Sequence, residues 1–208
     1  MQPILTFVDQ HGLAALYATV AVLFVGGFVK GAIGFALPLI GVAGLGAFLP
    51  AQQAVALLII PMLVSNLWQS CRTGFGAAWG TLWRFRLLLL VLTPAIVLFA
   101  QLLATAPEKL FYLTLGLGVT AFAISQLAGW RAAFMARAPR LSEVGAGLVG
   151  GFFGGIAGIW GPPVTLYLLA IDLSKEETMR ALGVIFGLGS VALTVGQLLS
   201  GVLNAQTA

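Results

Sequence analysis

Long stretches without a charged residue, separated by short polar segments, dominate the chain. A membrane crossing needs about 20 apolar residues, so each stretch is long enough for one. Backbone in lipid must satisfy its own hydrogen bonds, which makes crossings of this kind helical. The charge-free runs cover 10–29, 31–71, 87–107, 110–130, 144–171 and 181–208.

Two of these runs are interrupted by proline and glycine. The run 31–71 is long enough for two crossings, and Leu49-Pro50 breaks it near its middle. Gly161-Pro162-Pro163 divides the run 144–171 into one crossing and a short element. We therefore predict an all-α, polytopic membrane protein with eight helical elements, at 12–30, 34–49, 52–70, 85–104, 106–129, 142–158, 162–172 and 175–203.

Composition supports a membrane protein and excludes other classes. The 208 residues are 60% apolar and 8% charged, whereas a soluble domain has about 25% charged residues. That excludes an ordinary soluble domain, a disordered chain and a nucleic-acid binder. The net charge of +4 therefore reports membrane topology.

Residue types needed for most enzymatic or metal chemistry are scarce. The single Cys71 excludes an internal disulfide or a cysteine-based metal site, and the single His11 excludes an HExxH site. The six acids lie at predicted helix ends or in loops, two of them in the capping-box patterns Thr105–Glu108 and Ser174–Glu177. With no P-loop motif either, we expect no enzyme, no metal and no cofactor.

The basic residues predict the orientation. The loops 70–86, 131–140 and 172–180 carry most of them, and eight elements place all three loops on one face. Cytoplasmic loops are enriched in Lys and Arg, so these loops are predicted to be cytoplasmic and both termini outside. We expect a multi-pass protein of a bacterial cytoplasmic (inner) membrane, with a basic face that contacts anionic lipids.

The sequence contains an internal repeat at an offset of 124 residues. Segment 26–40, GGFVKGAIGFALPLI, matches segment 150–164, GGFFGGIAGIWGPPV, at four glycines, one Phe and one Pro. The predicted topology gives the two copies opposite directions, which is typical of secondary transporters with broken helices. Tight helix crossings alone would explain the glycines but not the paired prolines. The predicted divisions are 1–104, 105–141 and a shortened second repeat, 142–208.

These two glycine-rich segments resemble the paired motifs of the TauE/SafE sulfite exporter family. The segment AQQAVALLIIPMLVSNLWQ matches the helix after the first motif, and the similarity extends from about residue 13 to about 203. The resemblance implies a permease that moves sulfite and organosulfonate anions out of the cell. Members usually carry further helices after the last one here, so the chain is either truncated or completed by association into a homo-oligomer.

An anion needs a positive site, and the two breaks provide one. Short helices beginning near Pro38 and Pro162 would direct their positive N-terminal ends at the site. We predict that the substrate lies between 31–38 and 155–162. The predicted substrate-binding residues are Lys30, Gly31, Gly34, Pro38, Asn66, Gly155, Gly158, Trp160, Gly161 and Pro162.

Three of these side chains have alternative explanations. Lys30 either binds the anion or extends to the cytoplasmic interface. Asn66 either lines a polar cavity or forms an interhelical hydrogen bond, and Trp160 belongs either to the site or to an interfacial aromatic belt. The predicted function is export of sulfite or related organosulfonates by alternating access. A non-transporting accessory subunit and a passive anion channel are the alternatives.

Overall fold

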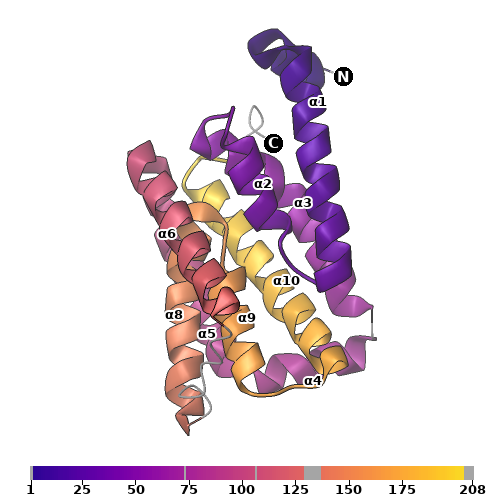
Figure 1. Cartoon of the computed structure of the whole chain (residues 1–208), viewed down its shortest axis with the longest axis vertical. Helices are drawn as coiled ribbons and strands as arrows, with labels where there is room; N and C mark the ends of the chain where they lie inside the picture. Colours follow the sequence, from indigo (N-terminus) through magenta and orange to yellow (C-terminus); the bar gives the residue numbers. More distant parts are fainter. Residues whose placement is uncertain (1, 73, 106, 129–136, 204–208) are drawn as a thin grey trace.

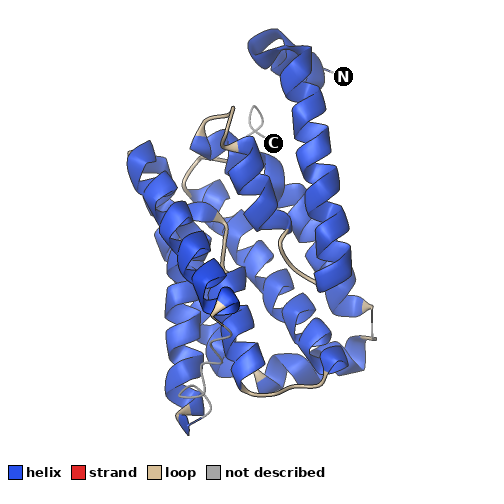
Figure 2. Cartoon of the chain, viewed as in Figure 1, coloured by secondary structure: helices blue, strands red, loops and turns tan. Residues whose placement is uncertain are grey.

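The computed structural model describes residues 2–72, 74–105, 107–128 and 137–203, which are helical with short connections and no strand (Figure 2). The prediction of an all-α chain is confirmed for this part. The helices are α1 (Gln2–Ile33), α2 (Leu37–Leu45), α3 (Ala51–Cys71), α4 (Phe75–Arg84), α5 (Arg86–Thr105), α6 (Glu108–Leu127), α8 (Pro139–Ala157), α9 (Gly161–Ala170) and α10 (Lys175–Leu199).

Four of the described helices are long and apolar enough to cross a membrane: α1 from Leu5, α3, α5 and α10. In Figure 1, α1 and α3 run downward, whereas α8 and α10 run upward, and α4 lies across the lower end. The start of α1 and the end of α10 therefore lie at the same end of the bundle (Figure 1). The short helices α2 and α9 each reverse the direction of the long helix before them.

Glycines bring the central helices together. On α8, a β-carbon added at Gly151 would overlap the Ala95 side chain of α5, and one at Gly155 would lie 2.6 Å from the Phe99 Cβ. On α10, a β-carbon at Gly183 would lie 2.9 Å from the Gln69 backbone of α3. Small residues permit such close approach of helices in membranes, so α5–α8 and α3–α10 form the centre of the bundle.

The structure corrects the prediction that 70–86 is only a loop, because it contains helix α4. Phe75, Trp79 and Trp83 recur every four residues on one exposed face of that helix, at 79%, 62% and 52% exposure. Arg84 at its end forms an ion pair of 3.0 Å with Glu177 on α10. An amphipathic helix with aromatic and basic residues, lying across one end of a bundle, is typical of a membrane interface.

The other predicted helix boundaries differ from the structure by a few residues, except for the start of the first helix. Helix α1 begins at Gln2 rather than at residue 12, with a non-helical Gly12 (φ 82°) inside it. The element predicted at 34–49 is helical only over Leu37–Leu45. Helix α8 begins at Pro139, three residues before the prediction, and α10 ends at Leu199. Residues 131–136 of the predicted basic loop 131–140 lie outside the described part.

One of the two predicted capping boxes forms. The Ser174 hydroxyl accepts a hydrogen bond from the Glu177 backbone N–H, and Glu177 in turn accepts from the Ser174 N–H. The prediction at Thr105 is wrong, since Thr105 is the last residue of α5 and Glu108 is the first residue of α6, too early to be the third residue after a cap. Glu108 instead accepts from the Ala51 backbone N–H, and so joins the start of α6 to the start of α3.

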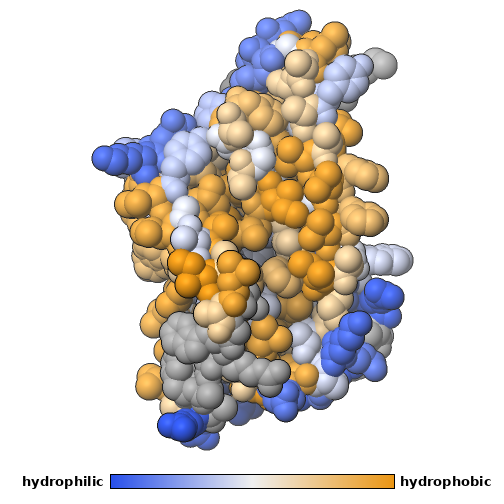
Figure 3. Space-filling view, in the orientation of Figure 1, coloured by the Kyte–Doolittle hydropathy of each residue, from blue (hydrophilic) through white to orange (hydrophobic). Residues whose placement is uncertain are grey.

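An apolar surface separates two polar ends in the space-filling view (Figure 3). The lower end carries the described arginines in and next to α4 and those near the starts of α8 and α10. Lys109 lies at the upper end, in the first turn of α6. The charge asymmetry expected of a membrane protein is therefore present along the long axis.

Candidate functional site

Two helix breaks with the same local geometry occur 124 residues apart. Gly34 ends the α1 segment with φ +85°, and Gly158 ends α8 with φ +70°; both values are left-handed and favour glycine. The Gly34 N–H donates to the Lys30 carbonyl oxygen at 2.7 Å, and the Gly158 N–H donates to the Gly154 carbonyl oxygen at 2.9 Å. The repeat therefore extends from the sequence into backbone geometry.

A proline follows each break, in the first turn of the short helix. Pro38 lies at the start of α2 and Pro162 at the start of α9, where a missing N–H does not interrupt the helix. The N-cap residues are Ala36 and Trp160, and neither caps its helix with a side-chain hydrogen bond. Both short helices thus present the positive ends of their dipoles inside the bundle.

The two breaks approach each other through aromatic side chains. A β-carbon at Gly161, in the second break, would lie 3.8 Å from Cδ2 of Phe35 in the first break and 3.5 Å from Cζ of Phe186 on α10. Trp160 is 1% exposed, and its ring lies edge-to-face against Phe186 with a centroid separation of 6.1 Å. Its indole Nε1–H is buried without a hydrogen-bond partner.

A buried polar cluster lies beside these breaks, with Asn66 of α3 at its centre. The Lys30 ammonium donates to Asn66 Oδ1. The Asn66 amide donates to Ser190 Oγ at 2.6 Å and to the Phe186 carbonyl oxygen at 3.3 Å. Asn66 is 1% and Ser190 2% exposed, so these bonds join α1, α3 and α10 in the interior. We call Lys30, Asn66 and Ser190 the polar cluster.

The bond between Asn66 and Ser190 has a geometric consequence. The two residues are separated by 124 positions, the offset of the repeat, and are therefore equivalent in the two copies. Equivalent groups that touch each other lie on the axis that relates the copies. Neighbouring bonds repeat as well, since Ser70 Oγ donates to the Asn66 carbonyl oxygen and Thr194 Oγ1 to the Ser190 carbonyl oxygen, both at 2.8 Å. The α3–α10 crossing is thus the centre of the repeat.

Lys30 breaks this symmetry, because its equivalent in the second copy is Gly154. It is 6% exposed and is the only charged side chain that is buried among the residues the structure describes. A buried ammonium without a buried carboxylate leaves an uncompensated positive charge in the bundle, and such a group in a membrane protein marks a functional site.

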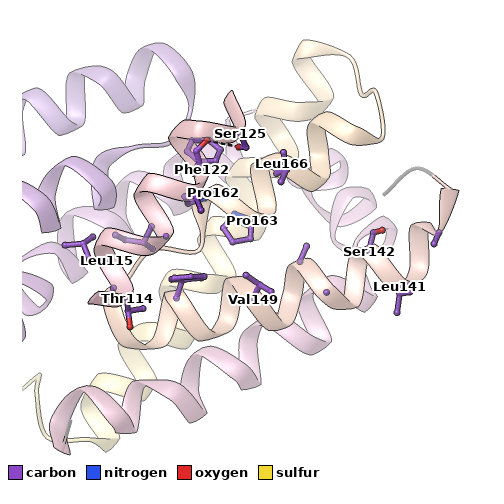
Figure 4. A pocket seen from close by; sticks show the side chains of 18 residues that line it. Thr114, Leu115, Phe122, Ser125, Leu141, Ser142, Val149, Pro162, Pro163 and Leu166 are labelled. Carbon is purple, nitrogen blue, oxygen red and sulfur yellow. Dashed lines mark hydrogen bonds between the residues drawn. The ribbon is translucent and has the colours of Figure 1, made fainter. Parts of the chain in front are cut away.

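A cavity elsewhere in the bundle is a different kind of site. A volume of about 450 Å³ lies between α6, α8 and α9. In Figure 4, Leu115 and Phe122 of α6 face Val149 of α8 and Pro162 of α9 across it. Its lining residues carry no charge, and the polar ones are Thr114, Ser125 and Ser142. An apolar cavity of this kind does not stabilise an anion, so we place the candidate anion site at the polar cluster.

The structure brings together some of the residues predicted for the site. Lys30 and Asn66 join directly, Trp160 and Gly161 reach the cluster through Phe186, and Gly34, Pro38, Gly158 and Pro162 shape the breaks. Gly31 instead lies on the exposed face of α1, and Gly155 packs against α5. Ser190 and Phe186 are not among the predicted substrate-binding residues, although the repeat offset from Asn66 points to Ser190. No group of His, Cys, Asp or Glu in the described residues is arranged to hold a metal.

Comparison with known proteins identifies one family. No curated protein matches the chain, and no solved structure matches it. Residues 19–208 match the family model described as sulfite exporter TauE/SafE, which covers the breaks, the polar cluster and α10. The chain therefore belongs to the TauE/SafE sulfite exporter family of integral membrane transporters.

Proposed function

We propose that this chain exports sulfite or a related organosulfonate by alternating access, with the anion bound at the polar cluster. The observation that supports the proposal most strongly is Lys30, the one buried cation of the described residues, next to two broken helices. Sulfite and sulfonates carry negative charge on several oxygens that accept hydrogen bonds. An ammonium, an amide and helix N-termini are donors that match them.

Contacts connect the cluster to both breaks. Asn66 donates to the Phe186 carbonyl oxygen, the Phe186 ring lies against Trp160, and a β-carbon on Gly161 would contact both Phe186 and Phe35. In the proposed bound state the anion replaces Asn66 Oδ1 as the acceptor of the Lys30 proton. Asn66 then turns its amide N–H groups, which donate to Ser190 Oγ and the Phe186 carbonyl oxygen in this structure, toward the substrate.

Burial supports a transporter in which access alternates. Lys30 is 6% and Asn66 1% exposed, so an anion reaches them only when helices move apart. The α3–α10 crossing lies at the centre of the repeat, and rocking about it would open the cluster first to one end and then to the other. A weak site suits this cycle, because an interaction with a helix terminus contributes at most about 2 kcal/mol and allows release.

The test is transport by the purified chain in liposomes. We expect uptake of labelled sulfite that saturates with concentration and is competed by organosulfonates more than by chloride. Flux that rises linearly without saturation would identify a passive channel instead. Absence of flux, from protein with intact helical circular dichroism, would favour a non-transporting accessory subunit and contradict the proposal.

A further inference from the structure

The cavity of about 450 Å³ between α6, α8 and α9 is open along one side of α8. Leu141 and Val149 line it, yet their side chains are 74% and 47% exposed. A β-carbon added at Gly145, which lies between them on the same lining face, would meet nothing within 4 Å. The cavity is therefore a groove that a molecule can enter from beside the helix bundle.

The groove is built to receive hydrocarbon. Its lining residues carry no charge, and its volume lies in the range of about 300–1,000 Å³ that is usual for sites of small ligands. Figure 4 shows Leu141 and Ser142 at one end of the groove and Val149 and Pro163 further along it. The apolar lining and the open side suit a flexible acyl chain.

Positive charge lies at the lower end of this groove, where α8 begins. Ala138, Leu141 and Ser142 line that end, and Arg137 and Arg140 directly precede the first two in the sequence. Both arginines are exposed, and neither pairs with an acid of the described residues. Their guanidinium groups are therefore free to bind an anion at the mouth of the groove.

The acidic residue of α8 does not oppose these arginines. The Glu143 carboxylate accepts a hydrogen bond of 3.1 Å from the Leu88 backbone N–H, and so is held toward α5. Ser142, by contrast, lines the groove and brings a hydroxyl group to its lower end. Guanidinium and hydroxyl donors together match the oxygens of a phosphate.

The length of the groove matches one leaflet of a bilayer. From Ala138 to Val149 the helix rises roughly 16 Å, at about 1.5 Å per residue. Half of a hydrocarbon core of about 30 Å is roughly 15 Å. Val149 faces Phe122 and Pro162 across the groove (Figure 4). A chain whose headgroup lies at the arginines would therefore end beside the second helix break.

We propose that this groove binds an anionic phospholipid, with one acyl chain between α6, α8 and α9 and the phosphate at Arg137 and Arg140. The two halves of the site call for one molecule, since a free phosphate would leave the groove unfilled and a neutral lipid would leave the arginines without a matching net charge. A basic residue near a membrane surface strengthens binding of anionic lipid about fivefold, so two should favour it roughly 25-fold. The site does not depend on which anion the protein transports.

The first test is lipid binding to the purified full chain, measured by native mass spectrometry. Phosphatidylglycerol and phosphatidylcholine with identical acyl chains are compared, and glycerol phosphate serves as the headgroup without chains. We expect phosphatidylglycerol to bind roughly 25-fold more tightly than phosphatidylcholine, and glycerol phosphate not to compete. Equal affinity for the two lipids, or full competition by glycerol phosphate, would overturn the proposal.

Variants separate the headgroup end from the chain end. The double change Arg137→Gln and Arg140→Gln should remove the preference for phosphatidylglycerol. Gly145→Leu should weaken binding of both lipids about tenfold, because its side chain displaces about two methylene groups of the acyl chain.

Each variant has a matched control that should leave lipid binding unchanged. For the arginines it is the double change Arg72→Gln and Arg86→Gln, at the same end of the bundle but next to α4. For Gly145 it is Gly116→Leu on α6, which also has open space around it and does not line the groove. Unchanged affinity in both test variants would overturn the proposal.

A second measurement locates the acyl chain. Phosphatidylglycerol with a photoreactive diazirine at the end of one chain should label peptides that contain Val149 or Pro163, and the yield should fall in Gly145→Leu. Labelling confined to other helices, or labelling of these peptides that Gly145→Leu leaves unchanged, would contradict occupancy of the groove.

Discussion

Removal of the Asn66 side chain should destabilise the protein mainly through Lys30. Asn66 makes three side-chain hydrogen bonds, to Lys30, Ser190 and the Phe186 carbonyl oxygen. In Asn66→Ala the Phe186 carbonyl keeps the bond that Ser190 Oγ donates at 2.8 Å, so those two groups remain satisfied. The Lys30 ammonium alone loses its partner inside the bundle.

The size of the effect follows from the kinds of bond. A hydrogen bond to a charged group contributes about 1.5–3 kcal/mol, whereas neutral interhelical bonds average roughly 0.6 kcal/mol. Asn66→Ala should therefore lower the free energy of unfolding by about 2–4 kcal/mol. In a Lys30→Met background the same change should cost about 1.5–3 kcal/mol less, because no buried charge is left unpaired.

The assay is reversible unfolding by sodium dodecyl sulfate in mixed micelles, followed by tryptophan fluorescence, on the four proteins of a double-mutant cycle. The free-energy cost of the cavity left at position 66 is the same in both backgrounds and therefore cancels in the coupling energy. The control is Ser65→Ala, the neighbour on α3 whose hydroxyl bonds only within its own turn, to the Met62 carbonyl oxygen. A coupling energy below about 0.5 kcal/mol would refute the proposed interaction.

Three further predictions test the breaks, the core and the interface. Gly158→Ala and Gly34→Ala should each lower the free energy of unfolding by about 1–2 kcal/mol through left-handed strain. The nearest atom to a β-carbon at Gly158 would be 3.8 Å away, and the Met179 sulfur, 2.7 Å from a β-carbon at Gly34, lies at the end of a flexible side chain that can move. No loss in either variant, in the same unfolding assay, would contradict this. Gly155→Leu should prevent correct folding, whereas Gly27→Leu should keep native helical circular dichroism and protease resistance; similar behaviour of both would disprove the packing account. In single-tryptophan variants, lipids brominated near the headgroup should quench Trp79 and leave Trp160 unquenched, and strong quenching of Trp160 would contradict its burial.

The breaks and their spacing were predictable because glycine and proline act locally. A left-handed turn at Gly34 and Gly158, and proline in the first turn of the next helix, follow from backbone sterics without knowledge of the fold. The assignment to membrane proteins followed from the small number of charged residues. The capping box at Ser174 was equally local, and it formed as the sequence indicated.

Other features depended on packing that the sequence does not display. Helix α4 was missed because Arg84 and the flanking Arg72 and Arg86 indicated a loop. Its exposed aromatic face becomes evident only when the helix lies across the end of the bundle. Glu108 was expected to cap its own helix, yet it accepts from Ala51 of a distant element. The opposite surroundings of Gly31 and Gly155, equivalent in sequence, arise because α5 covers α8 and no described helix of this copy covers that face of α1.

The central claim is that the buried Lys30 charge binds the transported anion. Its most direct test is sulfite transport by liposomes containing the natural chain, Lys30→Gln or Lys109→Gln, with equal amounts of folded protein. Lys109 is the matched control, a lysine in the first turn of α6 at the other end of the bundle. We predict loss of saturable sulfite uptake in Lys30→Gln and unchanged uptake in Lys109→Gln. Uptake by Lys30→Gln with the rate and half-saturation concentration of the natural chain would contradict the account.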